Sequence, residues 1–398
     1  MKDVFIIHAK RTPIGKLGGS LSHFRVDDML ATLFRDFKDS FSFDMKEIDD
    51  VITGCANQAG EDNRNLSRMA TILAGLPLEV PGVTVNRLCA SSLDAIIDGY
   101  SRIASGIADC ILVGGAESMT RAPYVMSKGS SAFGRDSQMY DTTFGWRFPN
   151  PKMKEMFPLL GMGETAEEVA QKLNITREEQ DLFAYNSHMK ASKAWEDGKF
   201  ANEVVSLELQ LKKELLKVSE DECPRANTTL EQMAKLPAVF RKGGSVTPGN
   251  SSPMNDGASC VAIVSEDFLR KHNLKPLARI TGGAVRGIHP SIMGLGPVES
   301  TKVLLKKFNK KISDFDVFEF NEAFAVQALG CMRELEVDPE KVNLKGGAIA
   351  LGHPLGCSGA RITTTLTHIL QENKNFKQAL ATMCVGVGQG VSLSLENC

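Results

Sequence analysis

The chain has 398 residues, of which 42% are hydrophobic and 24% are charged, and its formal net charge is -2 at pH 7. These values predict a globular protein of two or three domains with a large core. They argue against a nucleic acid or an anionic membrane surface as a partner. The 9 cysteines contain no C-x-x-C pair, which argues against a metal or disulfide framework and predicts a reducing, cytoplasmic environment.

The first third of the chain alternates predicted strands and helices. Residues 1–13 carry charges around a short apolar core, so they indicate a first strand rather than a signal peptide. The remaining pattern predicts helices over 27–38 and 65–74 and strands over 48–54 and 111–119. No apolar run approaches the length of a membrane span.

A β-branched strand at 83–85 runs into Cys89, and small residues and a helical pattern follow. A helix N-terminus lowers the pKa of a nearby thiol and favours the reactive thiolate. A free cysteine is more usually a buried structural residue, however. From this stretch alone, Cys89 is either a nucleophile or a packing residue.

The middle of the chain, from about 120 to 250, breaks this alternation and resembles an insertion. It is rich in aromatic residues, glycine and proline, and it contains helical patterns over 165–173 and 176–197. Thr176 followed by Glu179 predicts a capping box at the start of the second helix. The segment is also the more basic one, which indicates either a solvated face or a dock for a polyphosphate ligand.

The last third contains a stretch with five glycines and one histidine, GGAIALGHPLGCSGAR, at Gly346–Arg361. A strand-like entry, a glycine loop carrying His353 and a helical exit make it a candidate site for a reacting group. A strand over 315–320 ends on Asn321. A later strand over 380–385 enters a second glycine turn, Gly386–Gly390.

The two outer thirds repeat the same order of elements, although their sequence identity is weak. Val85-Asn86 before Cys89 corresponds to Val342-Asn343 before His353. Two duplicated halves packed back to back would bring equivalent turns together. The repeat therefore predicts one pocket shared by Cys89, His353, Asn321 and Cys384.

Four blocks carry a family resemblance: NRLCASS at 86–92, NEAF at 321–324, the glycine and histidine block at 346–359, and C-x-G-x-G-x-G at 384–390. With these blocks in order, the chain resembles the thiolase family along essentially its full length. The resemblance implies an α/β fold of duplicated βαβαβαββ halves in a five-layered α-β-α-β-α arrangement. The halves would span residues 1–270 and 271–398, with a loop domain inserted at about 120–250.

By this resemblance, Cys89 is the nucleophile that takes the acyl group, and His353 is the base that makes its thiolate. Cys384 is the second acid/base at the α-carbon, and Asn321 holds a water that stabilises the enolate oxygen with His353. The N–H groups of Cys89 and Gly386 form the other oxyanion hole. A Claisen reaction requires these parts, namely an acyl-carrying thiolate, a base for a weakly acidic C–H and donors for two oxyanions.

Coenzyme A and acyl-CoA enter this interpretation as substrates, with no permanently bound cofactor and no metal. The resemblance places Arg225 near the adenine and Ser252 near the pantetheine. The residues that would line the pantetheine tunnel are Pro248, Gly249, Met162, Ala323 and Phe324. The implied activity is reversible thiolysis of a 3-oxoacyl-CoA, as in fatty acid metabolism and β-oxidation.

One departure from the family bears on the substrate. Thiolases specialised for acetoacetyl-CoA usually have histidine before the Met162-Gly163 pair, where this chain has Gly161. The run at 141–148 is instead similar to 3-oxoadipyl-CoA thiolases. The sequence thus favours a larger 3-oxoacyl substrate and leaves the acyl chain and the physiological direction open.

Three alternatives accompany this interpretation. The first is an enzyme that forms acetoacetyl-CoA strictly, and the second is a decarboxylating condensing enzyme, which would lack the second cysteine. The third is a thiolase-like lipid-binding protein without catalysis, which would have lost one of the four groups. We also expect a homo-oligomer. The resemblance favours a tetramer in which residues 127–141 join two dimers.

Overall fold

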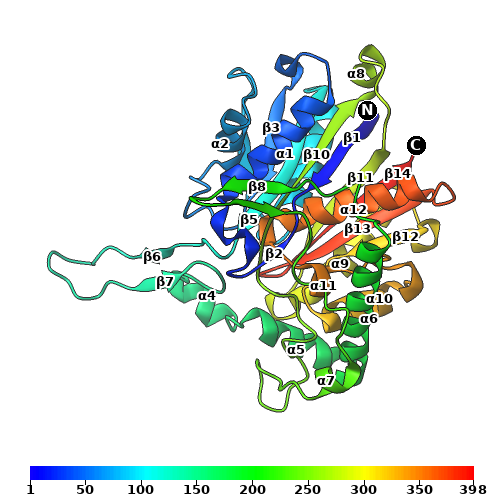
Figure 1. Ribbon diagram of the computed structural model, residues 1–398. Coiled ribbons are helices and arrows are strands. Elements are labelled where there is room, and N and C mark those ends of the chain that lie inside the picture. The colour runs from blue at the N-terminus through cyan, green and yellow to red at the C-terminus, as the bar shows by residue number, and fades with distance from the viewer.

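The centre of the molecule is a ten-stranded sheet whose two halves have the same arrangement of strands (Figure 1). The structure is a computed structural model that describes residues 1–398. The first half of the sheet runs, in spatial order, β1 (Val4–Arg11), β10 (Asn255–Ser265), β5 (Cys110–Ser118), β3 (Asp50–Gly54) and β4 (Val83–Val85). The second half runs β11 (Ala278–Gly287), β14 (Gln389–Asn397), β13 (Gln378–Val385) and β12 (Val317–Phe320). A short strand, β2 (Gly15–Lys16), pairs with β10.

The two halves also share their strand directions. In each half the first two pairings are antiparallel and the third is parallel. Where the first half continues with β4, the second half has only one parallel bridge, between Phe318 and Val342. The strand-like entry expected at Val342 stops there because Asn343 adopts a left-handed backbone with φ of 49°. The repeat confirms the duplicated halves expected from the sequence.

Hydrogen bonds join the two half-sheets into one. Strand β1 pairs with β11 over three residues, with Val4 opposite Ile280 and Ile6 opposite Ala278. The two sheets expected from the resemblance are therefore continuous at this seam, although helices still separate the rest of them.

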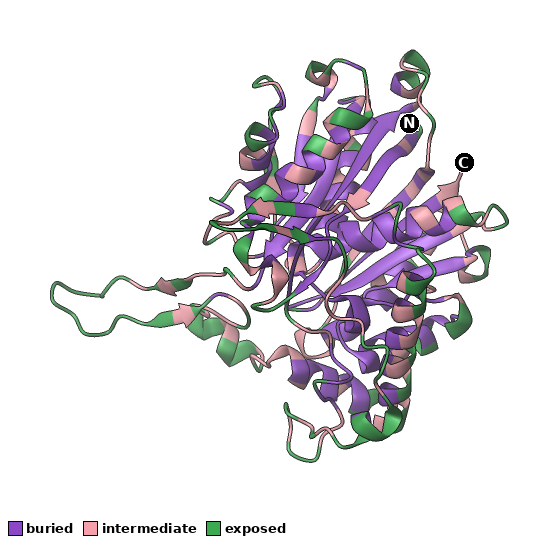
Figure 2. Ribbon diagram, viewed as in Figure 1, coloured by how far each residue is buried: buried purple, intermediate pink, exposed green.

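Helices form three layers around and between the half-sheets. The central helices are α3 (Ser91–Ala104) and α12 (Ser358–Glu372), and one core of 30 buried residues holds their side chains against strands of both halves. On the first half, the outer layer consists of α1 (Val26–Ser40) and α2 (Leu66–Leu73). On the second half, it consists of α9 (Gly296–Lys307) and α10 (Ala325–Leu335). This arrangement confirms the five-layered α-β-α-β-α fold, and Figure 2 shows its buried centre.

Helix α1 illustrates why these segments are helical and lie where they do. Leu30, Leu33, Phe34 and Phe37 fall on one face at the helical spacing and are fully buried. Truncating a buried phenylalanine such as Phe34 to alanine typically costs about 3–5 kcal/mol. Packing of this face against the sheet, rather than helix propensity alone, therefore holds α1 in place.

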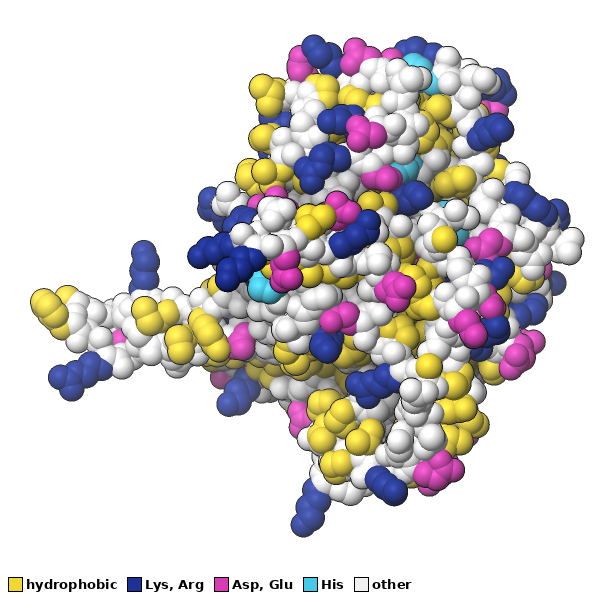
Figure 3. Space-filling view, viewed as in Figure 1, with side chains coloured by type: hydrophobic (Ala, Val, Ile, Leu, Met, Phe, Trp, Pro, Cys, Tyr) yellow, Lys and Arg dark blue, Asp and Glu magenta, His cyan; other side chains and the backbone are white.

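The segment between β5 and β10 interrupts the first half. It contains β6 (Tyr124–Met126), β7 (Met139–Asp141), α4 (Pro151–Met156), α5 (Met162–Leu173), α6 (Arg177–Glu196), β8 (Leu207–Gln210), β9 (Leu215–Val218) and α7 (Leu230–Ala234). Helix α6 begins with the expected capping box of Thr176 and Glu179. The β6–β7 hairpin projects from the body, and Figure 3 shows hydrophobic side chains along it.

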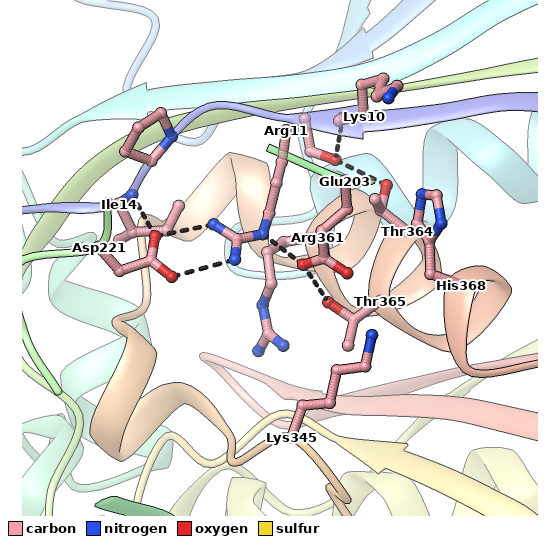
Figure 4. Close-up of polar contacts among 12 residues, drawn as sticks. Lys10, Arg11, Ile14, Glu203, Asp221, Lys345, Arg361, Thr364, Thr365 and His368 are labelled. Atoms are coloured by element: carbon pink, nitrogen blue, oxygen red, sulfur yellow. Dashed lines mark hydrogen bonds and ion pairs between the residues drawn. The ribbon is translucent and has the colours of Figure 1, made fainter. Parts of the chain in front are cut away.

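Buried ion pairs fasten this segment to the first strand (Figure 4). Arg11, at the end of β1, places its Nε 2.6 Å from Glu203 and its Nη1 2.7 Å from Asp221. Asp221 also accepts the Ile14 N–H at 2.7 Å and the Trp195 indole N–H at 3.1 Å. These contacts satisfy charges that would otherwise be costly to bury.

Two further helices complete the chain, α8 (Glu266–Lys271) after β10 and α11 (Ala348–Leu351) inside the glycine and histidine block. Helix α11 was not expected, because four residues are too few to show a helical period. None of the helices combines the length and the apolar composition that crossing a membrane requires.

Candidate active site

A cavity of about 260 Å³ opens where the two halves and the inserted segment meet. Cys89 and Gly386 line it from the turns after β4 and β13. The inserted segment contributes residues 142–147 and 160–162, with Phe144, Trp146 and Leu160 as apolar walls. The cavity is therefore built from connections between elements, while the sheet supports it from below.

The turn that carries Cys89 is held by its own side chains. Leu88 has a left-handed backbone with φ of 47°, which is unfavourable for a branched residue. The Leu88 N–H donates to Asn86 Oδ1 at 2.9 Å, and Ser91 Oγ donates to the Leu88 carbonyl at 2.6 Å. The turn leads from Leu88 through Cys89 to the start of α3 at Ser91.

The thiol of Cys89 has a perturbed pKa. Burial raises the pKa to about 11, while hydrogen bonds from the N–H groups of Gly386 and of Cys89 itself act in the opposite direction. The lowered pKa expected from the position at a helix start is thus not found, because desolvation outweighs it. A protonated thiol at neutral pH needs a base before it can attack.

His353 lies between α11 and α12 and is held as a neutral imidazole. Burial lowers its pKa to about 3, and the charge of Arg361 contributes in the same direction. Its Nδ1 is 2.6 Å from Ser358 Oγ, and Ser358 Oγ donates to the Pro354 carbonyl at 2.8 Å. Because that hydroxyl proton is committed to Pro354, Nδ1 must be the protonated nitrogen. This assignment makes Nε2 the unprotonated nitrogen, which can accept a proton.

The backbone around His353 is fixed by Asn255 on β10. The His353 N–H donates to Asn255 Oδ1 at 2.8 Å. Asn255 Nδ2 in turn donates to the Gly15 carbonyl at 2.9 Å and lies 3.2 Å from Cys223 Sγ. At Gly352, with φ of 111°, a Cβ would lie 2.6 Å from Asn255, so glycine is required there.

Asn321 follows β12 and contacts the imidazole of His353. Its Nδ2 lies 3.4 Å from both ring nitrogens, and its backbone N–H donates to the Thr382 carbonyl at 3.0 Å. Asn321 Oδ1 is buried without a protein donor. A buried acceptor without a partner is a place for an ordered water or a ligand group.

Cys384 is the second-last residue of β13, and its side chain is buried near Cys89. Burial raises its pKa well above the ordinary value, and interaction with Cys89 and Cys331 raises it further. The glycine turn that follows contains Val387 and Gly388 in left-handed conformations. The structure thus brings Cys89, Gly386 and Cys384 together and places Asn321 against His353.

The residues expected to bind CoA divide into separate groups. Met162 lines the cavity that contains Cys89, whereas Arg225 and Gly249 line a second cavity of about 570 Å³ together with His188. Ser252 donates through its N–H and its Oγ to the Ala323 carbonyl, both at 3.0 Å. These polar groups therefore bond to each other.

The last two residues of the expected tunnel differ in exposure. Phe324 is buried, and its ring packs edge-on against Phe240 at a centroid distance of 6.2 Å. The Phe240 ring lies over Gly163, where a Cβ would be 2.1 Å away. Pro248 is exposed and lines neither cavity.

Sequence reasoning assigned no role to Ser358, Asn255 or Arg147. Ser358 comes five residues after His353 at a helix start, a spacing that places its hydroxyl near the ring. Arg147 is a lone cation in an aromatic run, which could have marked it for ligand binding. Asn255 gave no local signal, because it reaches His353 only through the sheet.

Comparison with known proteins agrees with this geometry. The family profile of the thiolase N-terminal domain matches residues 4–267, and that of the thiolase C-terminal domain matches residues 274–397. The chain is 50% identical to the beta-ketoadipyl-CoA thiolase of Pseudomonas aeruginosa, with 99% of each chain covered. It is also 50% identical to the 3-oxoadipyl-CoA/3-oxo-5,6-dehydrosuberyl-CoA thiolase of Escherichia coli, with 100% of each covered.

A solved structure extends the likeness to three dimensions. Human mitochondrial 3-ketoacyl-CoA thiolase in complex with CoA superposes with a TM-score of 0.92 at 39% identity. The match covers 100% of this chain and 98% of the human chain.

Proposed function

The chain belongs to the thiolase family, and from that premise we propose that it cleaves a 3-oxoacyl-CoA through an acyl thioester on Cys89. The reverse reaction is a Claisen condensation with acetyl-CoA. The observation that carries the proposal is the meeting of the Cys89 thiol with the Gly386 N–H and with a second thiol, Cys384. A neutral histidine with an unprotonated Nε2 supplies the base.

In the cleavage direction, His353 Nε2 takes the Cys89 proton and the sulfur attacks the 3-oxo carbon. The N–H groups of Cys89 and Gly386 stabilise the resulting oxyanion. The bond between C2 and C3 then breaks, and the electron pair leaves on the acetyl-CoA enolate. Cys384 protonates that carbon, while Asn321 and a water support the enolate oxygen.

The second half of the reaction releases the shortened acyl group. The thiol of a free CoA gives its proton to the Cys384 thiolate and attacks the thioester on Cys89. Cys89 leaves as a thiolate and regains its proton from His353. In this proposal, Arg225 binds the adenine part of CoA and Ser252 binds its pantetheine part.

The substrate we propose is 3-oxoadipyl-CoA or a 3-oxoacyl-CoA of similar length. The names of the two bacterial relatives support this choice. Gly161, at the start of α5 in the cavity wall, leaves space that a histidine would fill, since a Cβ there would meet only Glu164 at 3.5 Å. A chain specialised for acetoacetyl-CoA alone would not need that space.

The test is thiolysis of a panel of 3-oxoacyl-CoA substrates, followed by peptide mapping of the trapped acyl-enzyme. We expect activity beyond acetoacetyl-CoA and a single acyl label on Cys89. Activity confined to acetoacetyl-CoA would overturn the substrate, and a label on Cys110 or Cys357 would overturn the mechanism.

We also propose a cytoplasmic homotetramer that serves fatty acid metabolism, such as β-oxidation. The 9 free cysteines support a reducing compartment. Four residues of the β6–β7 hairpin support a contact between subunits, because each is at least 67% exposed: Tyr124, Met126, Phe133 and Met139. Light scattering that gives a monomer at micromolar concentration would contradict the assembly.

A further inference from the structure

Arg147 is the only basic residue that lines the cavity containing Cys89. It follows the aromatic wall formed by Phe144 and Trp146. No carboxylate lies within ion-pair distance of its guanidinium group, whereas many of the other arginines in the chain have such a partner. Those paired with a carboxylate include Arg11, Arg25, Arg102, Arg121, Arg177, Arg241 and Arg361.

The contacts that Arg147 does make are with neutral oxygens. Nη1 donates to Asn57 Oδ1 at 3.4 Å and to the Thr142 carbonyl at 3.3 Å, and Nη2 donates to the Asn57 carbonyl at 2.9 Å. A guanidinium group has five N–H donors, so Nε–H and one Nη2–H remain without an acceptor. These two donors point along one edge of the group and match the two oxygens of a carboxylate.

The acidic residue of the same cavity does not balance this charge. Glu117 accepts the backbone N–H groups of Ala56 at 2.8 Å, Asn57 at 3.2 Å and Gly356 at 2.8 Å. It is 2% exposed, and burial raises its pKa above the ordinary value, so the backbone N–H groups rather than Arg147 are its partners. The cavity wall therefore holds an oriented cation whose counter-ion is not part of the protein.

We propose that Arg147 binds the terminal carboxylate of the acyl chain and selects 3-oxoacyl-CoA substrates that end in a carboxylate over those that end in a methyl group. The inference rests on the proposed thiolase function and deepens it. The reacting end of the acyl chain lies at Cys89, and the apolar side chains of Phe144 and Trp146 accompany the methylene groups. Asn57 and Thr142 hold the guanidinium group in place before the substrate arrives.

A purely structural role would make Arg147 an anchor of residues 142–147 on Asn57. The two roles differ in what the variant Arg147→Gln does to two matched substrates. 3-Oxoadipyl-CoA and 3-oxohexanoyl-CoA have the same chain length and differ at the terminal group alone. Loss of an anchor would lower kcat/KM equally for both substrates. Loss of a carboxylate-binding residue would lower kcat/KM for 3-oxoadipyl-CoA alone.

We expect wild-type enzyme to have the higher kcat/KM with 3-oxoadipyl-CoA. Arg147→Gln should lower that value about 10- to 150-fold, the range of one hydrogen bond to a charged group, and should leave 3-oxohexanoyl-CoA within about twofold. Arg147→Lys should keep part of the preference for 3-oxoadipyl-CoA, because lysine keeps the positive charge but lacks the two parallel N–H donors of the guanidinium group. The control is Arg270→Gln on α8, an exposed residue outside the cavity, which should leave both substrates unchanged.

A second measurement uses only wild-type enzyme and so does not depend on the folding of a variant. Cleavage of 3-oxoadipyl-CoA leaves succinyl-CoA, and cleavage of 3-oxohexanoyl-CoA leaves butyryl-CoA. Succinyl-CoA should be the stronger product inhibitor, and added salt should reduce its advantage.

Equal inhibition by the two products, or an equal loss of both activities in Arg147→Gln, would overturn the role of Arg147 and leave the thiolase function intact. If wild-type enzyme cleaves neither substrate and Cys89 is not acylated, the proposed function itself is wrong, and this inference is wrong with it.

Discussion

The two halves of the molecule share a sheet order and differ in the connections that leave it. In the first half, the connection between β5 and β10 contains the whole inserted segment, including helices α4 to α7. In the second half, the equivalent strands β13 and β14 are joined by the short turn Gly386–Gly388. The duplicated sheet thus provides two sets of equivalent strand ends. The residues in the connections determine the chemistry at each of them.

The turns before the two central helices differ in the same way. The turn before α3 holds a strained Leu88 by side-chain hydrogen bonds and presents Cys89. The connection before α12 inserts α11 and uses Gly352 to place His353 against Asn255. Nucleophile and base therefore occupy related positions of a duplicated fold, and each position has its own means of fixing the backbone.

The largest expected effect comes from the reactive turn of the first half. Cys89→Ala should lower thiolysis by about 10⁴-fold or more, because no other group can carry the acyl chain. Cys357→Ala, a buried thiol that follows the histidine turn of the second half, should retain activity. The measurement is steady-state thiolysis together with mass spectrometry of the acylated protein. A Cys89→Ala enzyme that still forms one acyl thioester per subunit would contradict this division of roles.

The next effect separates the two half-reactions. Cys384→Ala should reduce condensation by about 10²–10⁴-fold, the usual contribution of a positioned acid/base. Acylation of Cys89 should stay within a small factor, because CoA can leave as a thiolate without a proton from Cys384, and because His353 and the Gly386 N–H remain. A burst of one acyl group per subunit checks the first step, and deuterium exchange into acetyl-CoA checks the second. Normal condensation by the variant would mean that another group removes the α-proton.

A smaller effect tests how the base is oriented. Ser358→Ala removes the acceptor of the Nδ1 proton of His353, so the ring loses its fixed tautomer. We expect kcat to fall about tenfold, the size of one hydrogen bond, with KM little changed. Ser300→Ala removes a buried hydroxyl bond to Ser392 elsewhere in the second half and serves as the matched control. If the two variants lose activity equally, Ser358 has only a structural role.

The smallest effect concerns the inserted segment, which only the first half has. Burial lowers the pKa of His188 on α6 to about 4, below the ordinary value of 6.5. The unfolded chain therefore binds more protons between those values, so the unfolding free energy should rise with pH across that window. One such group contributes up to about 1.4 kcal/mol per pH unit.

Denaturant titrations at several pH values check this prediction, with His188→Asn expected to flatten the dependence. A wild-type stability that stays constant from pH 4 to 6.5 would show that His188 does not titrate on unfolding in this window.

The sequence predicted features that depend on local pattern. Apolar periodicity located α1 and α3, the strand-to-helix turn at 83–92 located Cys89, and the glycine turns located His353 and Cys384. The sequence could not predict the pKa of Cys89, because the groups that desolvate the thiol come from distant parts of the chain. Nor could it show that Val342 forms a single bridge, since this depends on the backbone at Asn343. The surroundings of Arg147 likewise depend on Asn57, which lies far from it in the chain.

The ion pairs of Arg11 join parts of the chain that are synthesised at different times. Arg11 is 192 residues from Glu203 and 210 residues from Asp221. At a synthesis rate of 5–20 residues per second, the first strand emerges about 10–40 s before either partner exists. Its neighbours in the sheet, β10 and β11, are synthesised later still. In the nascent chain, the apolar strand β1 is therefore exposed and the charge of Arg11 is unpaired. That charge helps to protect the strand from aggregation until the rest of the sheet has been synthesised.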